Sequence, residues 1–191
     1  RVILPLRQHA GADAIPLVKP GDTVLKGQLI AAAGTEVSAP VHASTSGRVL
    51  TIGPVQAPHP SGLAANAIVI ESDGADRWID LEIPADPFSQ APMELAERVT
   101  RAGIVGMGGA IFPAAVKLKQ GARHEIKTVL VNGSECEPYL TTDDRLMRER
   151  AEQIVDGARL IQHILRAYRI VIAIEDNKAE AIAAMRAAAE P

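Results

Sequence analysis

The stretch "GIVGMGGAIFPAAVKL", residues 103–118, places four glycines in its first seven positions and then passes through a Phe-Pro pair into a helical pattern. Glycine allows positive φ and lets the main chain approach a flat or anionic ligand without a Cβ in the way. We expect this use of Gly106, Gly108 and Gly109. A tight turn between two helices would need glycines as well, and the spacing alone leaves both interpretations open.

Two familiar phosphate-binding motifs do not fit this stretch. A P-loop needs a lysine directly after its last glycine and then Ser or Thr, but Lys117 comes later and Leu118 follows it. A dinucleotide fingerprint would have Ile111 in place of its third glycine, and the segment follows a helical pattern where that motif follows a strand. Pro113 nevertheless suits the first turn of a helix, whose N-terminus favours phosphate, and Lys117 could add a cation.

A second stretch, "VNGSECEPYLTTDDR" at residues 131–145, follows the apolar run "IKTVLVNG". That run predicts a buried strand that ends at Asn132-Gly133. Open α/β sheets bind ligands at the carboxyl ends of their strands. Taken alone, the stretch is typical of a solvated acidic loop; together with the glycine loop upstream it becomes a candidate pocket wall. Its acidic residues are Glu135, Glu137, Asp143 and Asp144.

The pattern around these stretches predicts alternating helices and strands. Apolar spacing predicts a helix over 92–102 and a long amphipathic helix over 144–167. The run at 168–175 predicts a strand covered on both faces, and 177–190 a last helix with Asn177 as its N-cap. Strand, helix, strand, helix indicates an α/β sheet.

The first half of the chain has a different composition. Short apolar runs punctuated by Gly, Pro and Asp predict a small β-rich domain over 1–80, followed by a Pro-rich connector over 81–92 and an α/β domain over 93–191. The segments "VKPGDTVLKGQLIA" and "SAPVHASTSGRVL" resemble the lipoyl/biotinyl barrel-sandwich family, but the region of the carrier lysine contains none. We therefore expect a structural or docking module, with His42 and His59 solvated and not bound to metal.

Composition excludes several classes of protein. Hydrophobic residues make up 47%, aromatic residues 3%, and the net charge is −3, which excludes a disordered chain and gives no basic footprint for nucleic acid. A single cysteine, Cys136, excludes an internal disulfide or a multi-thiolate metal site and favours a reducing compartment. No apolar run approaches the roughly 20 residues of a membrane span. The chain starts at Arg1 without a methionine, so we expect an excised fragment.

The two motifs together resemble a known family. "GMGGAIFPAAVKL" followed by "VNGSECEPYLTTDDRLMRE" looks like the C subunit of the Rnf ion-translocating electron-transport complex. It is more distantly similar to the flavin- and NADH-binding subunit of respiratory complex I. The barrel-sandwich half is similar as well, so the resemblance spans nearly the whole chain. A cobalamin reductase of bacterial microcompartments shares this layout, and a non-catalytic docking module is a further alternative.

The resemblance implies a site for FMN and NADH, without a catalytic side chain or a metal ligand in this chain. The glycine loop would lie against FMN and the NADH diphosphate, Lys117 would contact the flavin or its phosphate, and the acidic stretch would line FMN, with Glu137 beside the nicotinamide. The implied cofactor-binding residues are Gly106, Gly108, Gly109, Ala110, Lys117, Asn132, Ser134, Glu135, Cys136 and Glu137.

The family also implies an activity and a location. Hydride would pass between NADH and FMN, and single electrons would pass to [4Fe-4S] clusters of the full-length protein, whose ligands are absent from this chain. Partner subunits would couple this transfer to ion translocation, with the protein peripheral on the cytoplasmic side of the bacterial inner membrane. Ile111, Ala114 and Ser134 depart from residues common in these families, and a later flavin loop is missing. We therefore expect the fragment alone to be inactive and to bind FMN weakly or not at all.

Overall fold

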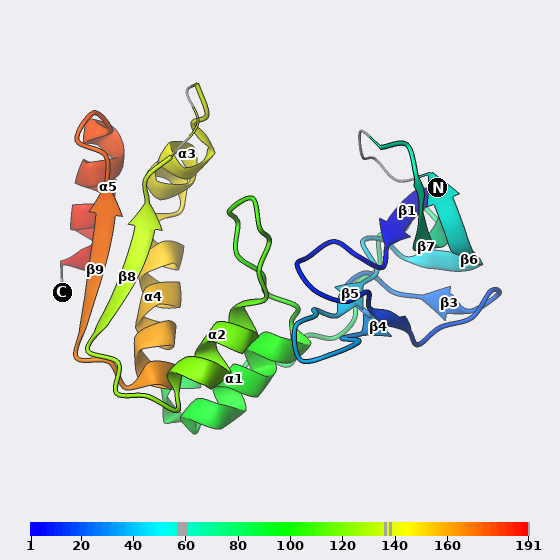
Figure 1. Ribbon diagram of the computed structural model, residues 1–191, viewed down its shortest axis with the longest axis horizontal. Helices are drawn as coiled ribbons and strands as arrows, with labels where there is room; N and C mark the ends of the chain where they lie inside the picture. The colour runs from blue at the N-terminus through cyan, green and yellow to red at the C-terminus, as the bar shows by residue number, and fades with distance from the viewer. Residues whose placement is uncertain (57–60, 136, 138, 191) are drawn as a thin grey trace. The chain divides into compact units, whose positions relative to one another are not determined.

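The computed structural model describes residues 1–56, 61–135, 137 and 139–190. The chain forms two compact units, one made of Arg1–Ala85 with Ala96–Lys117 and the other of Asp86–Leu95 with Leu118–Pro191 (Figure 1). The first unit is rich in β-structure and the second alternates helices with parallel strands. The prediction of a β-rich module followed by α/β structure is confirmed.

The first unit contains two small antiparallel sheets. One has the strand order β1-β7-β6-β3 and the other the order β2-β4-β5. The long pair β6 and β7 is the centre of the larger sheet, and β1 and β3 flank it. The strands are β1 (Val2–Pro5), β2 (Ile15–Pro16), β3 (Thr23–Val24), β4 (Leu29–Ala32), β5 (Val41–His42), β6 (Gly47–Gln56) and β7 (Ala64–Ser72).

Aliphatic side chains from both sheets form the core of this unit. Val24 of β3, Ile30 of β4, and Ile68 and Ile70 of β7 are completely buried. They belong to one cluster with smaller residues such as Ala14 and Ala43, and the described members of this cluster include no aromatic side chain. This agrees with the low aromatic content of the sequence.

One turn of this unit requires glycine for two independent reasons. Gly11 has φ +100°, a conformation that residues with a Cβ rarely adopt. A Cβ at this position would also lie 1.9 Å from the carbonyl oxygen of Val37. The backbone N–H of Ala12 donates a hydrogen bond to that same oxygen, so the carbonyl cannot easily move away.

We predict that Gly11→Ala lowers the free energy of unfolding by roughly 2 kcal/mol or more, because strain and overlap add. Gly109→Ala is the matched control in the same unit. Gly109 has no positive φ, and a Cβ added there would meet no heavy atom within 4 Å, so we expect a change within about 0.5 kcal/mol. Thermal unfolding followed by circular dichroism measures both. Equal stability of the two variants would contradict the prediction.

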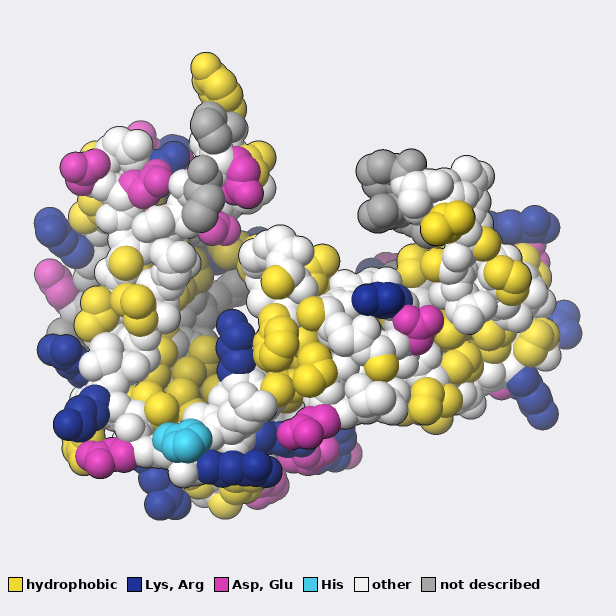
Figure 2. All heavy atoms as spheres, in the orientation of Figure 1, with side chains coloured by type: hydrophobic (Ala, Val, Ile, Leu, Met, Phe, Trp, Pro, Cys, Tyr) yellow, Lys and Arg dark blue, Asp and Glu magenta, His cyan; other side chains and the backbone are white. Residues whose placement is uncertain are grey.

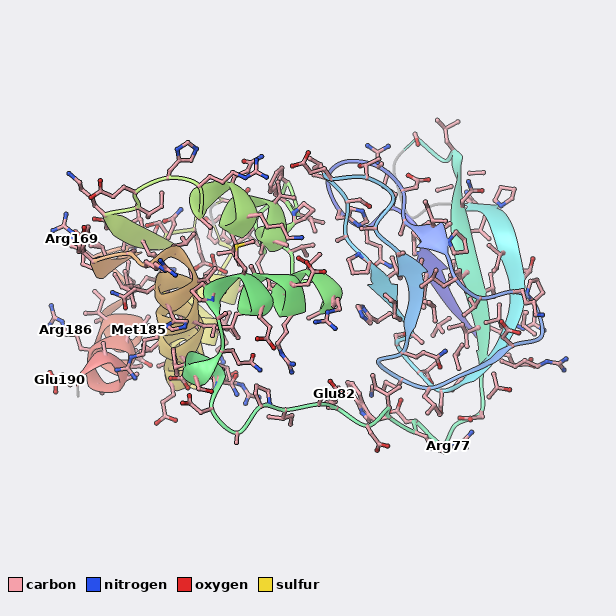
Figure 3. The ribbon with its side chains drawn as sticks, turned by 90° about the horizontal axis from the view of Figure 1, so that it is seen from below. Arg77, Glu82, Arg169, Met185, Arg186 and Glu190 are labelled. Carbon is pink, nitrogen blue, oxygen red and sulfur yellow. The ribbon has the colours of Figure 1, made fainter. Side chains whose placement is uncertain are left out.

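A buried serine organises the end of β7. Ser46 is completely buried, donates a hydrogen bond to Asp73 Oδ1 at 2.6 Å and accepts one from the backbone N–H of Arg77 at 2.9 Å. The Arg77 guanidinium lies 2.8 Å from Asp73 Oδ2, and the N–H of Ala75 donates to Asp73 Oδ1. Figure 3 marks Arg77, on the segment that follows β7. The hydrogen bond from Ser46, then Arg77 and the Ala75 N–H, lower the pKa of Asp73 to about 2.

This lowered pKa predicts a pH dependence of stability. A carboxyl group that ionises more easily in the folded state stabilises that state above its unfolded pKa of about 3.9. The contribution is lost as pH falls from about 4 towards 2. Ser46→Ala removes the first donor, so we expect the pKa of Asp73 to rise in this variant and the acid-unfolding midpoint to shift to higher pH. A carboxyl-carbon NMR titration of the wild type and Ser46→Ala checks this, and identical Asp73 titration curves would contradict it.

The second unit is built around two parallel strands. β8 (Thr128–Gly133) pairs in parallel with β9 (Arg169–Ile174), from Thr128 opposite Arg169 to Gly133 opposite Ile174. Helices precede, connect and follow these strands. In the second unit these are the short η1 (Pro87–Ser89), α3 (Thr142–Glu149), α4 (Ala151–Leu165) and α5 (Ala179–Ala189). The boundary between the two units falls within α1 (Pro92–Arg101) and α2 (Ala114–Gly121).

Two helix predictions need correction. The single helix predicted over 144–167 is wrong, because the chain breaks at Arg150, which has φ −134° and ψ 30°. The break lets α3 pack against α5 while α4 packs against both strands. Asn177 is not the N-cap of the last helix either, since Lys178 occupies that position without a side-chain capping bond. The helix predicted over 92–102 is confirmed as α1.

The prediction that 168–175 is a strand covered on both faces is also wrong within the described residues. Ile172 and Ile174 of β9 pack against α4 and α5 in one cluster with Val155 and Met185. On the opposite face, Leu130 of β8 is 64% exposed and Val171 of β9 is 39% exposed. Figure 2 shows hydrophobic side chains gathered over these two strands. The cause is that the described helices that pack on the sheet lie on one face of it.

Candidate cofactor site

The glycine loop connects α1 to α2 as a narrow excursion, drawn in green in Figure 1. Gly103, with φ +68°, ends α1. The two sides of the loop are then held together by hydrogen bonds from the N–H of Ala114 to Ile104 O at 2.9 Å and from the N–H of Gly106 to Phe112 O at 2.8 Å. The loop therefore has a bonded stem and a short, exposed tip at residues 107–111.

The glycines at the tip are not explained by backbone strain or by packing. The prediction of positive φ at Gly106, Gly108 and Gly109 is wrong, and Ile111 has the positive φ instead, at +45°. A Cβ at Gly108 or Gly109 would meet no heavy atom within 4 Å. Any residue could therefore occupy these two positions as far as the described protein atoms are concerned, and the space beside this backbone is open to a ligand.

The tip also offers hydrogen-bond donors. Among the described residues, no backbone acceptor contacts the N–H groups of Met107, Gly108, Gly109 and Ala110, whereas the N–H of Ile111 donates to Gly108 O at 3.0 Å. Lys117, near the start of α2, places its ammonium 5.6 Å from the centroid of the Phe112 ring. Four of the predicted site residues, Gly106, Gly108, Gly109 and Ala110, thus lie in this loop, and the fifth, Lys117, lies in the helix that follows it.

The second predicted motif lies at the carboxyl end of β8. Asn132 Oδ1 accepts a hydrogen bond from the N–H of Ser134 at 3.1 Å, which turns the chain away from the strand. Gly133 has no room for a side chain, because a Cβ would lie 2.8 Å from the sulfur of Met147 and 3.1 Å from Ala173 O. This glycine is required by the packing of α3 over the end of the strand, unlike the glycines of the loop tip.

Glu135 has a largely buried side chain, which is 6% exposed. Its Oε1 accepts hydrogen bonds from the N–H of Asp143 at 2.9 Å and from Thr142 Oγ1 at 3.4 Å, at the start of α3. Lys178 places its ammonium 3.5 Å from Oε2. Burial opposes ionisation of this carboxyl, but the N–H groups of Asp143 and Asp144 and the Lys178 ammonium together lower the pKa of Glu135.

The remaining predicted residues of this motif differ in their surroundings. Ser134 is partly buried and Glu137 is exposed. The carbonyl oxygen of Glu137 accepts a hydrogen bond from the N–H of Leu140 at 3.2 Å. Cys136 lies outside the described residues. The roles of all ten predicted residues toward a cofactor stay predictions, because Gly106, Gly108, Gly109, Ala110 and Lys117 lie in the first unit and the others in the second.

Lys178 is a residue of this sheet edge that the sequence motifs do not indicate. It lies far along the chain from Glu135, and only the parallel pairing of β8 with β9 brings the two residues to the same sheet edge. A lysine directly after Asn177 at the start of a helical pattern carries no signal of its own. Pairing across a sheet cannot be deduced from one sequence.

His42 also differs from its expectation. It is half-buried and not fully exposed, and burial lowers the pKa of its imidazole, partly offset by a hydrogen bond to the Arg101 backbone. It lines an open cavity of about 670 Å³ in the first unit, beside Trp78, Leu81 and Ile104. His59 lies outside the described residues. Within those residues, no group of three or more His, Cys, Asp or Glu is arranged to hold a metal ion.

Comparison with known proteins identifies both halves of the chain. Residues 1–75 match the family model of the RnfC barrel sandwich hybrid domain, and residues 99–191 match that of the Nuo51 FMN-binding domain. In the described part of the chain, no helix combines the length and apolar character that crossing a bilayer would need.

Curated relatives share one name, that of the C subunit of the ion-translocating oxidoreductase complex. The relative from Rhodobacter capsulatus is 54% identical over 182 residues, which are 95% of this chain and 35% of that protein. The relative from Haemophilus influenzae strain PittEE is 50% identical over 184 residues, 96% of this chain and 28% of the relative. The relative from Pseudomonas aeruginosa is 51% identical over 188 residues, 98% of this chain and 24% of the relative.

The chain thus spans from about a quarter to about a third of the length of these relatives. Its two halves match the two domain models in the order in which the fold presents them, β-rich unit first and α/β structure second. The chain therefore belongs to the RnfC family of ion-translocating oxidoreductase complex subunits.

Proposed function

We propose that this chain forms part of the FMN site of an electron-transport subunit that exchanges electrons between NADH and FMN and passes them on to iron–sulfur clusters. The clusters lie in the rest of the full-length protein, because this chain supplies no ligands for them. Partner subunits couple the electron transfer to ion translocation, and the subunit is peripheral on the cytoplasmic side of the bacterial inner membrane. The family match and the bare, open tip of the glycine loop support this function.

The observation that carries the proposal is the open space beside Gly108 and Gly109. Glycine is costly in a chain because it loses more conformational freedom on folding than other residues. Neither φ nor packing requires glycine at these two positions. Close approach of a ligand to the main chain does require it, and a planar isoalloxazine or a diphosphate is such a ligand.

Each set of residues has a distinct part in this site. The N–H groups of Met107, Gly108, Gly109 and Ala110 meet no backbone acceptor in the described part of the chain and are donors for phosphate oxygens, and Lys117 adds positive charge. On the family resemblance, Asn132, Ser134, Glu135, Cys136 and Glu137 would line the bound FMN, with Glu137 beside the nicotinamide of NADH; Cys136 lies outside the described residues. Bound FMN supplies hydride acceptance from NADH and one-electron release to clusters. The protein binds and orients the two nucleotides and controls the charge around them.

A docking function is a second candidate for the first unit, because one observation favours it. The cavity beside His42 is lined mostly by apolar side chains, together with the charged Glu82, Arg98 and Arg101, and its lining residues Trp78 and Leu81 are 55% and 60% exposed. Exposed large apolar groups of this kind are typical of interaction surfaces. No observation favours a cobalamin reductase over the Rnf-type function.

We predict that Gly108→Val in the full-length protein weakens FMN binding at least roughly tenfold, the equivalent of about 1.4 kcal/mol. The valine side chain enters open space, so the fold stays intact, but it blocks the approach to the main chain. Flavin content after gel filtration, FMN titration and NADH oxidation measure the effect.

Gly157→Val is the matched control, since Gly157 is an exposed residue of α4, lacks positive φ, and a Cβ added there would also meet no heavy atom within 4 Å. It makes the same substitution away from the proposed site residues, and we expect wild-type flavin content. Unfolding temperatures close to that of the wild type establish that both variants are folded. A folded Gly108→Val protein that keeps its FMN would overturn the proposed function.

A further inference from the structure

The carboxyl ends of β8 and β9 are tied together by one ion pair. Glu135 follows β8 by two residues, and Lys178 lies in the turn between β9 and α5. Their side chains are 6% and 18% exposed, and Nζ lies 3.5 Å from Oε2. Few charged side chains are buried to this extent unless they are paired. The pair therefore fixes both residues.

The position of Lys178 is set by its own main chain. Its N–H donates to Glu175 O at 3.1 Å, and its carbonyl oxygen accepts from the N–H of Ile182 at 3.0 Å, in the first turn of α5. Glu175 also lies near its ammonium, at 3.9 Å. These hydrogen bonds fix the backbone of Lys178 and so limit the positions that its ammonium can reach.

Glu135 in turn holds the start of α3. Thr141, at the N-cap of α3, makes no side-chain capping bond. The Glu135 carboxylate takes over this role by accepting from the N–H of Asp143, although it lies outside the helix. A carboxylate stabilises a helix N-terminus through the unpaired N–H groups and the helix dipole. The Glu135 side chain therefore connects the chain just after β8 to the first turn of α3.

Lys178 compensates the negative charge on Oε2 of Glu135. Within the described residues, Glu135 Oε2 is buried and accepts no hydrogen bond, so the ammonium is what compensates its charge. Without that cation, the carboxylate would be buried with one oxygen unsatisfied, which is unfavourable. The carboxylate would then turn towards water or take up a proton, and the segment that carries Ser134 and Glu137 would move with it.

We propose that Lys178 is a positioning residue of the cofactor site, which holds the Glu135 carboxylate, and with it the segment between β8 and α3, in the geometry that receives FMN. This inference rests on the proposed function, because it assumes that this segment is a wall of the FMN site. Lys178 acts through Glu135. The lowered pKa of Glu135 is consistent with that pairing.

The test is an FMN titration of the full-length protein, followed by flavin fluorescence, with variants of Lys178. We expect Lys178→Met to raise the Kd for FMN about tenfold, within the range found for coupled neighbours. Lys178→Arg keeps a cation beside Glu135 and is expected to restore binding to within about threefold of the wild type, a rescue that loss of packing alone would not show. If Lys178→Met does not fold, Lys178→Gln removes the same charge with a polar side chain.

Lys127→Met is the matched control. Lys127 is exposed, lies just before the start of β8 at the opposite end of the strand, and has no ion-pair partner within the described residues. The variant removes one positive charge from the same unit, and we expect an unchanged Kd. A loss equal to that of Lys178→Met would overturn the inference, because it would show a general charge effect.

A double variant tests the route through Glu135. In the Glu135→Gln background, Lys178→Met is expected to change the Kd by less than about twofold, because its partner is already neutral. The same loss in both backgrounds would overturn the inference. A wild type that binds FMN beside an unaffected, folded Lys178→Met variant overturns the inference alone. A wild type that binds no FMN overturns the proposed function together with it.

Discussion

The parallel pairing of β8 with β9 is the constraint on which the second unit depends. Six residue pairs in register, from Thr128 and Arg169 to Gly133 and Ile174, force the two strands to end at the same edge. The turn at Asn132, after β8, and the turn before α5, after β9, therefore lie at the same edge of the sheet. Residues far apart in the chain can share one electrostatic environment only because this pairing is fixed, which is why carboxyl edges of such sheets so often serve as binding sites.

The glycines of the two motifs serve different purposes, and the structure separates them. Gly133 is confined by Met147 and Ala173, so its absence of a side chain is a requirement of packing. Gly108 and Gly109 are confined by nothing within 4 Å. Packing inside the protein therefore requires the glycine at position 133, whereas no described protein atom requires glycine at positions 108 and 109. Only the surroundings of the Cβ position distinguish these meanings, since all three residues lack positive φ.

Features that depend on local chemistry could be predicted from the sequence. Pro92 at the start of α1 and Gly103 after its end defined that helix correctly, and the β-branched run before Asn132 defined β8. Prediction failed where neighbours in space decide. Apolar spacing continues through Arg150, but packing of α3 on α5 breaks the helix there. The positive φ fell on Ile111 and not on a glycine, because the loop stem sets the conformation of the tip. Lys178 could not be predicted either, because the pairing of β8 with β9 decides that Glu135 is its partner.

The backbone of Ile111 has a consequence for the whole first unit. A β-branched residue with φ +45° is held in an unfavourable conformation, at a cost of about 1–3 kcal/mol. Its carbonyl oxygen accepts a hydrogen bond from the N–H of Ala10, and the N–H of Ala14 donates in turn to Leu6 O. The tip is thus hydrogen-bonded to the turn near the N-terminus of the chain. This hydrogen bond connects the strained residue of the tip directly to the turn that contains Gly11, so the two segments share one restraint.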